Sequence, residues 1–338
     1  MEIKEVSDKQ VWDGFVTSCS DYTFVAGWSW GEINKKDGEK VFRLGLYQEE
    51  EILGVAQAIT ISARRGKILF VPHGPLIKDD FEKKFVEFKN YLFGLAKREK
   101  CVCLRISPWL IDSESNRRMF KTNGFIDSPS IMHAEDTWLV DVTGTEEEVM
   151  SRMRKTTRNL VRRGEREGIK ISQSQELEEV EHLYELQMEV VKRNNFVPFS
   201  KRYLKLEMEE FFKNDEAVLF LGGVGNDISG VALIVFLGKR AFYYQSGSKE
   251  TKEPVNYLLQ WRVIQEARKR GCTIYNMWGI APENVPNHPW RGLTIFKTGF
   301  GGEAKKYMHA QDLPISWQYH PLRLIEKIPK KWRQKVKI

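Results

Sequence analysis

The feature that most constrains the fold of this chain is an internal repeat. The triplet Gly-Val-Ala occurs at residues 54–56 and again 176 positions later, at 230–232. Phe-Lys-Thr occurs at 120–122 and at 296–298 with the same spacing, and Gly-Phe follows each copy closely. One matching triplet would carry no weight. Two at a single offset indicate that one structural unit is present twice.

Each half of the chain shows the same order of predicted elements, namely strands in a meander, then a helix, then a buried strand. This order resembles the N-acyltransferase (GNAT) architecture. The predicted elements are strands over 45–47, 52–62 and 67–72, a helix over 81–100 and a strand over 102–106, then strands over 217–222, 230–237 and 240–245, a helix over 255–270 and a strand over 273–277.

We therefore predict an α/β (α+β) fold of two tandem GNAT-like (acyl-CoA N-acyltransferase-like) domains. Each is expected to be a mixed, mostly antiparallel sheet flanked by helices. The first domain is expected over residues 1–143 and the second over 144–314, because Thr145 and Glu148 resemble a capping box that begins a helix. Residues 315–338 are expected to pack back on the first domain.

Hydropathy and cysteine usage lead us to expect a cytoplasmic protein. No apolar run approaches the roughly 20 residues needed to span a bilayer, and the N-terminus shows no secretory signal. The four cysteines lack the spacing of a metal or redox site. Cys101 and Cys103 alternate with apolar residues, as in a strand that packs into a core.

The net charge of +7 is concentrated in residues 151–170 and 321–338. Each cluster is either a solvated face or a contact for an anionic partner, such as RNA phosphates, a nucleotide or an acidic membrane. The basic stretch 330–333, which contains Trp332, favours a membrane surface.

The glycine-rich stretch 222–227 lies between two predicted strands with no helix after it, which predicts a hairpin turn and not a phosphate-binding loop. Acetyl-CoA enzymes place an Arg/Gln-x-x-Gly-x-Gly/Ala loop before a helix whose amides bind pyrophosphate. Residues 268–273 fail that pattern at its last position and end a helix. This argues against acetyl-CoA as the donor.

Several segments together match a family pattern over nearly the whole chain. The strongest are 254–261 (PVNYLLQW), 275–280 (YNMWGI) and 292–302 (GLTIFKTGFGG), supported by 28–31, 72–75 and 153–159. They resemble the FemABX family, the aminoacyl-tRNA-dependent transferases that build the interpeptide bridges of peptidoglycan.

The resemblance implies aminoacyl-tRNA as donor, with no further cofactor and no metal. The acceptor it implies is a UDP-MurNAc-peptide or the lipid-linked peptidoglycan precursor, with peripheral contact at the inner face of the plasma membrane. Residues 177–213 are too few for the long helical hairpin of some members, so the arm-less, FemX-like type is expected.

Three positions depart from the family pattern. Asn34 stands where a lysine is frequent, with Lys35 and Lys36 beside it. Ser107 replaces an acid, and Asn276 replaces the usual aspartate after a tyrosine. These changes bear on the contacts with the precursor.

The implied chemistry is aminolysis of an ester by a side-chain amine, which needs no enzyme nucleophile. Positioning supplies up to about 7–11 kcal/mol in ideal cases, and a donor at the developing oxyanion adds roughly 3–4 kcal/mol. The resemblance places the family's key lysine at Lys297, before a glycine-rich segment (299–302) that we expect to be flexible. Lys121 is its equivalent in the first half. An ordinary surface lysine is the alternative.

Five residues are expected to bind substrate: Lys35, Lys36, Arg193, Tyr244 and Phe296. The resemblance implies that Arg193 engages the precursor phosphate, which suits a bidentate guanidinium, although an arginine near a helix end also stabilises the helix dipole. Strand alternation directs Tyr244 or its neighbour Tyr243 into the cleft and the other into the core, and we favour Tyr244. Lys35 and Lys36 are candidates for a second phosphate contact.

The basic helix predicted after residue 153 is expected to contact tRNA through Arg154, Lys155 and Arg158, because cations on a helix pair with phosphates without reading bases. A role in stabilising the domain junction is the alternative.

The general base stays open among Glu303, Asp136 and the substrate itself. His73 and His288 are interpreted as residues that shape loops.

We expect an aminoacyltransferase that moves an amino acid from aminoacyl-tRNA to a side-chain amine of a peptidoglycan stem peptide. The alternative enzyme is a GNAT-type N-acyltransferase that uses acyl-CoA on another amine. A third class is a non-catalytic envelope-scaffold or RNA-binding protein, in which Lys297→Ala would change no phenotype.

Overall fold

The structure is a computed structural model that describes residues 1–63, 66–194, 197–285 and 287–327. The chain divides into two compact units, which we call unit 1 (Met1–Glu135 with Lys306–Ile338) and unit 2 (Asp136–Lys305). The stretch 330–333, for which the sequence favours a membrane contact, lies outside the described residues.

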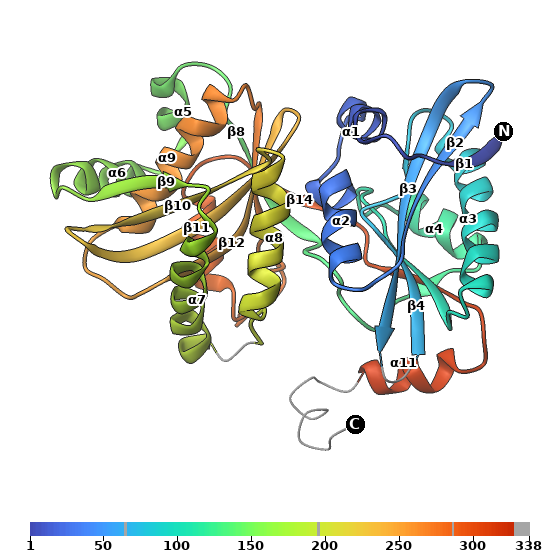
Figure 1. Cartoon of the computed structure of the whole chain (residues 1–338). Coiled ribbons are helices and arrows are strands. Elements are labelled where there is room, and N and C mark those ends of the chain that lie inside the picture. Colours follow the sequence, from blue (N-terminus) through green and yellow to red (C-terminus); the bar gives the residue numbers. More distant parts are fainter. Residues whose placement is uncertain (64–65, 195–196, 286, 328–338) are drawn as a thin grey trace. The chain divides into compact units, whose positions relative to one another are not determined.

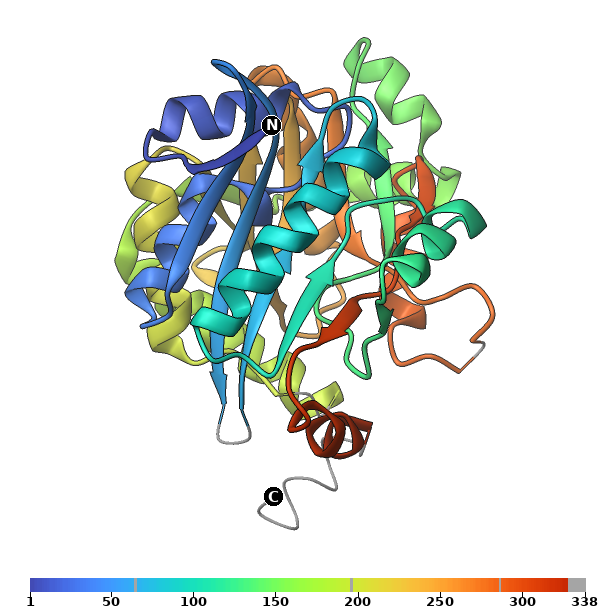
Figure 2. The same cartoon turned by 90° about the vertical axis from the view of Figure 1, so that its right-hand side faces the viewer.

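Unit 1 is a mixed sheet with helices on both faces (Figure 2). The strand order is β1-β2-β3-β4-β6-β15-β7, with β5 paired to β3; β4 and β6 run parallel. One face carries α3 and α4, and α11 packs Tyr319 and Leu322 against Ile68 and Phe70 on the other. The elements are β1 (Glu2–Glu5), α1 (Lys9–Ser18), α2 (Trp28–Lys36), β2 (Val41–Gln48), β3 (Glu51–Ala63), β4 (Gly66–Pro72), β5 (Leu76–Ile77), α3 (Phe81–Arg98), β6 (Cys103–Ser107), α4 (Glu114–Thr122), β7 (Ile126–Asp127), β15 (Gln311–Pro314) and α11 (Tyr319–Lys327).

Figure 1 shows the sheet of unit 2 with its flanking helices. The sheet has seven strands in the order β14-β8-β13-β12-β11-β10-β9, and β12 and β13 run parallel. Alternate residues of its strands, such as Phe220 and Ile234, form a core with α6 and α9. The opposite residues face α7 and α8. The elements are β8 (Asp136–Asp141), α5 (Glu146–Arg152), α6 (Lys155–Arg166), β9 (Lys170–Ser174), α7 (Val180–Asn194), α8 (Lys201–Lys213), β10 (Ala217–Val224), β11 (Asp227–Leu237), β12 (Arg240–Ser248), α9 (Val255–Lys269), β13 (Ile274–Gly279), α10 (Arg291–Thr298) and β14 (Glu303–Lys306).

Both units repeat one order of elements: a strand, two helices, a three-stranded meander, a helix, a parallel strand, a helix and a short strand. This order is β1, α1, α2, β2–β4, α3, β6, α4 and β7 in unit 1, where the two-residue β5 is additional, and β9, α7, α8, β10–β12, α9, β13, α10 and β14 in unit 2. The structure confirms the predicted fold class and shows the duplication that the repeated triplets indicate.

One strand of each sheet is exchanged between the two halves of the sequence. β8 follows β7 along the chain but pairs with β13 of unit 2, while β15 follows β14 and pairs with β6 of unit 1. Both unit boundaries therefore lie earlier than the expected ones at 143/144 and 314/315. The sequence around these strands repeats as well, because Met-His-Ala at 132–134 recurs 176 positions later at 308–310.

Local signals in the sequence correspond to observed structure. The capping box of Thr145 and Glu148 begins α5. The glycine-rich stretch 222–227 comprises the end of β10 and the hairpin turn to β11, where Gly225 has a φ of +62° that favours glycine. Within the described ranges, no helix is both long enough and apolar enough to cross a bilayer.

Candidate functional site

The two parallel strands of unit 2 separate after a short pairing. β12 and β13 pair from Arg240 with Ile274 to Phe242 with Asn276, and both strands then continue without further pairing to each other. We call this point the fork. In unit 1, the equivalent strands β4 and β6 pair along the whole of β6. Unit 2 is therefore the unit in which a ligand could reach between the parallel strands.

A β-bulge lies on β12 directly beyond the fork. Ile234 of β11 pairs with Tyr243, but the preceding Leu233 pairs with Gln245, so Tyr244 is an extra residue in the strand. A bulge changes the direction of the side chains next to it. Here it brings Tyr244 and Gln245 to the same face of the sheet, where both contact Glu207 of α8.

Lys297 is buried in the last turn of α10, with 4% of its surface exposed. Its Nζ donates a hydrogen bond of 2.6 Å to the main-chain oxygen of Gly279, the last residue of β13, and lies 5.5 Å from the centre of the Tyr243 ring. Burial lowers the pKa of Lys297 to about 7, because the charged amine loses its hydration. The side chain that the family resemblance singles out therefore exchanges its proton near neutral pH.

The equivalent lysine of unit 1 lies in a different environment. Lys121 is exposed on α4, while its neighbour Phe120 is buried in the core. The repeat by itself does not distinguish the two lysines, because they occupy equivalent positions. The structure separates them, because only Lys297 of this pair is buried and contacts the end of a parallel strand.

The glycine-rich segment after Lys297, which the sequence leads us to expect as flexible, is tightly packed against its neighbours. A Cβ atom on Gly299 would lie 2.3 Å from Thr157 Oγ1, and one on Gly302 would lie 2.0 Å from the main-chain oxygen of Leu139. Gly302 also has a φ of +96°. These glycines allow the chain to pass close to α6 and β8, which fixes the end of α10.

Phe296, an expected substrate contact, packs against the core of unit 2. Its ring centre lies 5.0 Å from that of Tyr257 and 5.3 Å from that of Phe300, both in edge-on geometry. The ring is half-buried. In this position it supports the helix that carries Lys297.

Tyr244 is on the face of the sheet opposite to Tyr243, as strand alternation predicts, since Tyr243 packs against the hydrophobic core. The Tyr244 hydroxyl donates to Glu207, whose side chain is fully buried. Burial raises the pKa of Glu207 to about 8 against the opposing effect of its hydrogen bonds. Burial also raises the pKa of Tyr244 well above its ordinary value.

A strained turn ends β13, which lies between Tyr244 and Lys297 in the sequence. Trp278 has a φ of +64°, which a bulky residue adopts only under constraint. Asn276 Oδ1 accepts a bond of 2.8 Å from the Trp278 amide and so holds the turn that carries the Gly279 carbonyl. Among the described residues, Asn276 Nδ2 has no hydrogen-bond partner. An aspartate, usual here in the family, would accept the same bond and would add a charge.

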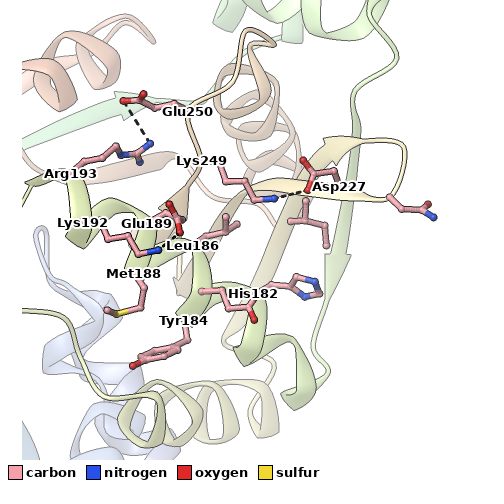
Figure 3. A pocket seen from close by; sticks show the side chains of 13 residues that line it. His182, Tyr184, Leu186, Met188, Glu189, Lys192, Arg193, Asp227, Lys249 and Glu250 are labelled. Carbon is pink, nitrogen blue, oxygen red and sulfur yellow. Dashed lines mark hydrogen bonds and ion pairs between the residues drawn. The ribbon is translucent and has the colours of Figure 1, made fainter.

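Arg193 lines a pocket of about 790 Å³ between α7, the start of β11 and the residues after β12 (Figure 3). Its guanidinium donates to the main-chain oxygen of Ser248 at 2.6 Å and lies 3.9 Å from Glu250. The neighbouring cations Lys192 and Lys249 pair with Glu189 and Asp227. The positive charge of the pocket is thus matched by carboxylates that an anionic ligand would have to displace.

Lys35 and Lys36 are exposed in the last turn of α2, in unit 1. Lys35 pairs with Glu32 at 3.0 Å, and Glu32 also pairs with the buried Arg43 at 2.8 Å. Cations at a helix C-terminus are stabilised by the helix dipole. Their position is open to solvent and therefore compatible with the predicted phosphate contact.

The three basic residues expected to contact tRNA differ in their surroundings. Arg158 donates to the main-chain oxygens of Ser151 and Met153 and so caps the end of α5. Arg154 donates to Thr298 Oγ1 at 3.0 Å and is exposed, and Lys155 is exposed as well. Arg158 stabilises the α5–α6 junction through these hydrogen bonds, while Arg154 and Lys155 are accessible to a polyanion.

His73 and His288 occupy loop positions, as the sequence indicates. His73 is buried with a φ of +42° and its Nδ1 lies 2.6 Å from Thr23 Oγ1. His288 Nδ1 accepts from the Trp290 amide at 3.1 Å.

Sequence reasoning missed Glu207 as a carboxyl group of the site. A signal was present, because Leu204, Met208 and Phe211 form the buried stripe of α8 and Glu207 falls within it. An acid at a core position of an amphipathic helix needs a buried partner. The partner, Tyr244, is apparent only in the folded chain.

Comparison with known proteins finds a family model that matches part of the chain and solved structures that share its fold. Residues 225–327 match the model of the FemAB family. A search of curated protein sequences finds no match. The matched range contains the three strongest family segments named from the sequence.

Three solved structures share the tandem architecture. The crystal structure of FemX aligns with a TM-score of 0.84 at 16% identity, over 96% of this chain and 100% of that one. A tandem GNAT protein from the clavulanic acid biosynthesis pathway aligns with a TM-score of 0.57 at 8% identity, over 93% and 98%. L-PGS from Bacillus licheniformis aligns with a TM-score of 0.55 at 14% identity, over 97% and 99%. At these identities the likeness is one of fold.

Proposed function

We propose that this chain, a member of the FemABX family, transfers an amino acid from aminoacyl-tRNA to a side-chain amine of a peptidoglycan precursor. The family match and the FemX fold support a transferase that forms peptidoglycan bridges. The tRNA donor, the acceptor and a cytoplasmic site at the inner membrane face belong to the proposal.

The observation that carries the proposal is the buried amine of Lys297 at the end of β13, beyond the fork. In the reaction, the acceptor nitrogen attacks the ester carbonyl and the carbonyl oxygen takes up negative charge. A protonated Lys297 that exchanges its Gly279 contact for this oxygen would stabilise the intermediate, and a single donor of this kind contributes roughly 3–4 kcal/mol. No nucleophile of the enzyme takes part.

The two units offer little support for the alternative donor, acyl-CoA. A CoA pyrophosphate would bind to free amides at the start of the helix that follows the meander. In unit 2 that helix begins after Pro254, which has no amide hydrogen, and the loop before it contains Glu250 and Glu253. In unit 1 it begins after Asp79 and Asp80. Lysines stand beside these acids, with Lys249 and Lys252 before α9 and Lys78 before α3, so both starts carry charges of both signs. In sequence pattern, neither start carries the Gly-x-Gly/Ala loop that presents free amides to a pyrophosphate.

The test is a transfer assay with purified protein. Radiolabelled aminoacyl-tRNA pools are incubated with UDP-MurNAc-pentapeptide or with its lipid-linked form, and radiolabelled acetyl-CoA is supplied in parallel. We expect label on one of the precursors from a tRNA pool. Label transferred only from acetyl-CoA, by protein shown to be folded, would overturn the proposal in favour of the acyl-CoA reaction.

A further inference from the structure

Glu207 is a carboxyl group buried on the α7 and α8 side of the unit 2 sheet. Its side chain has no exposed surface. The groups that face it are Tyr203 from its own helix and Tyr244 and Gln245 from β12. None of these partners carries a positive charge. A buried carboxyl in such surroundings is neutral at low pH and becomes charged only at a cost.

The bulge on β12 places Tyr244, which lies next to the fork, in contact with Glu207. Because Tyr244 is the extra residue of the strand, its hydroxyl and the Gln245 amide both reach the one carboxyl group. Gln245 Nε2 donates to Glu207 Oε2 at 3.2 Å, and Gln187 Nε2 of α7 donates to Gln245 Oε1 at 2.9 Å. This polar chain joins α7, β12 and α8.

Tyr244 also lies at the fork itself. The last pair between β12 and β13 is Phe242 with Asn276, two residues before Tyr244. Its ring meets Trp278 of the strained turn edge-on, with ring centres 6.4 Å apart. Tyr243, the next residue back, faces Lys297 on the other side of the sheet. Tyr244 and Lys297 therefore lie on opposite faces of the sheet, next to the part of β12 and β13 that is not paired.

We propose that Tyr244 and Glu207 form a proton relay that removes a proton from the attacking amine. Tyr244 is the group that touches the amine, and Glu207 is a positioning residue that acts through it. This inference rests on the proposed transfer to an amine and assigns the general base that the sequence leaves open.

The proton balance of the step is complete. The acceptor arrives as an ammonium ion and gives one proton to the Tyr244 oxygen, while the Tyr244 hydroxyl proton passes to the Glu207 carboxylate. The freed nitrogen lone pair forms the C–N bond, and the C=O π electrons move to the carbonyl oxygen. On collapse the bond to the ribose oxygen breaks, and that oxygen takes the second proton of the nitrogen. Glu207 returns its proton to solvent through Tyr244 when the product leaves.

Two variants test the relay. Glu207→Gln keeps a hydrogen-bond acceptor for Tyr244, and the Gln245 and Gln187 amides can flip to pair with it, but it takes up no proton. Tyr244→Phe keeps the carboxyl group and removes the link to the amine. In the tRNA-dependent assay we expect each to lower kcat about a hundredfold with little change in KM for the tRNA. We also expect each to lose the rise of kcat with pH that the wild type shows as Glu207 ionises.

Glu210→Gln is the matched control, because Glu210 is a second buried glutamate of α8 whose carboxyl accepts from Asn214 at 3.2 Å. It should keep the wild-type rate and pH profile. Infrared difference spectra of wild type against Glu207→Gln add a readout without substrate. A protonated carboxyl band should be present at pH 6 and lost above pH 8.

The outcomes separate the two proposals. A wild-type protein that transfers no amino acid from any tRNA pool overturns the proposed function and the relay with it. A wild type that transfers, together with a Glu207→Gln variant that keeps its rate and pH profile, overturns the relay alone and leaves Glu207 a structural group.

Discussion

The amine of Lys297 lies 2.6 Å from the main-chain oxygen of Gly279, which joins the end of α10 to the end of β13. The bond gives the buried amine a polar partner but no counter-charge. This explains why its pKa falls to about 7. Such a lysine can donate a hydrogen bond to the oxygen of the reacting carbonyl. Its burial and its contact both depend on the positions of α10 and β13.

Replacing this amine should abolish most of the activity. Lys297→Met keeps a chain of similar shape, and we expect kcat to fall about 10²–10³-fold, the range observed when one oxyanion donor is removed. Lys121→Met is the control, because Lys121 is exposed at the equivalent position of unit 1. Equal effects of the two substitutions in the transfer assay would contradict the assignment of the site to unit 2.

The rate should pass through a maximum between about pH 7 and pH 8. Lys297 carries its proton below its pKa of about 7, so its contribution is lost as the pH rises. Glu207 is a carboxylate above its pKa of about 8, so its contribution is lost as the pH falls. Near the maximum only a minority of molecules has a protonated Lys297 and an ionised Glu207 at the same time. The apparent pKa values of the rising and falling limbs therefore describe the two groups together. We expect Lys297→Met to keep only the rising limb and Glu207→Gln only the falling one.

Burial of Lys297 should also make stability depend on pH. The folded state lowers its pKa from 10.5 to about 7, so between these values the unfolded chain binds more protons and stability rises with pH. The stabilising effect of Lys297→Met should therefore be largest near pH 6 and should decline towards pH 10. Thermal unfolding of both proteins across this range measures the difference in Tm. A constant difference would show that the amine is not deprotonated by folding.

The packed glycines after α10 should tolerate no side chain. Gly302→Ala places a Cβ 2.0 Å from the Leu139 oxygen at a φ of +96°. We expect a loss of roughly 1–3 kcal/mol from the backbone conformation, with the steric contact adding to it. Gly292→Ala is the control, since Gly292 is in α10 and a Cβ there meets nothing within 4 Å. Chemical denaturation should find Gly292→Ala as stable as the wild type or more stable.

Substitutions in α6 should distinguish residues that contact tRNA from residues that stabilise the fold. Lys155, Arg162 and Arg166 are exposed, so their replacement by alanine should weaken tRNA binding across tRNA species and reduce its dependence on salt, with no change in Tm. Arg158→Ala should lower the Tm instead, because Ser151 and Met153 lose a donor. Filter binding and thermal unfolding measure the two effects. An unchanged tRNA affinity in the first set would argue against α6 as the tRNA contact.

Much of the fold could be predicted because it depends on local patterns. The helix expected over 81–100 is α3, and the strand expected over 240–245 is the first part of β12. The exchange of β8 and β15 was not predicted, since strand partners far apart in the chain are chosen by the assembled sheet. The same holds for the bulge at Tyr244, because it depends on the register with β11.

The sequence by itself determined the duplicated architecture, the family resemblance and the choice of Lys297, since these depend on residue types at fixed spacing. Only the tertiary structure decided that Lys297 is buried and Lys121 is not, that the glycines of 299–302 are packed, and that Glu207 meets Tyr244. The physical reason is that hydration and pKa depend on what surrounds a group in space. Those surroundings come from segments that the order of residues keeps far apart.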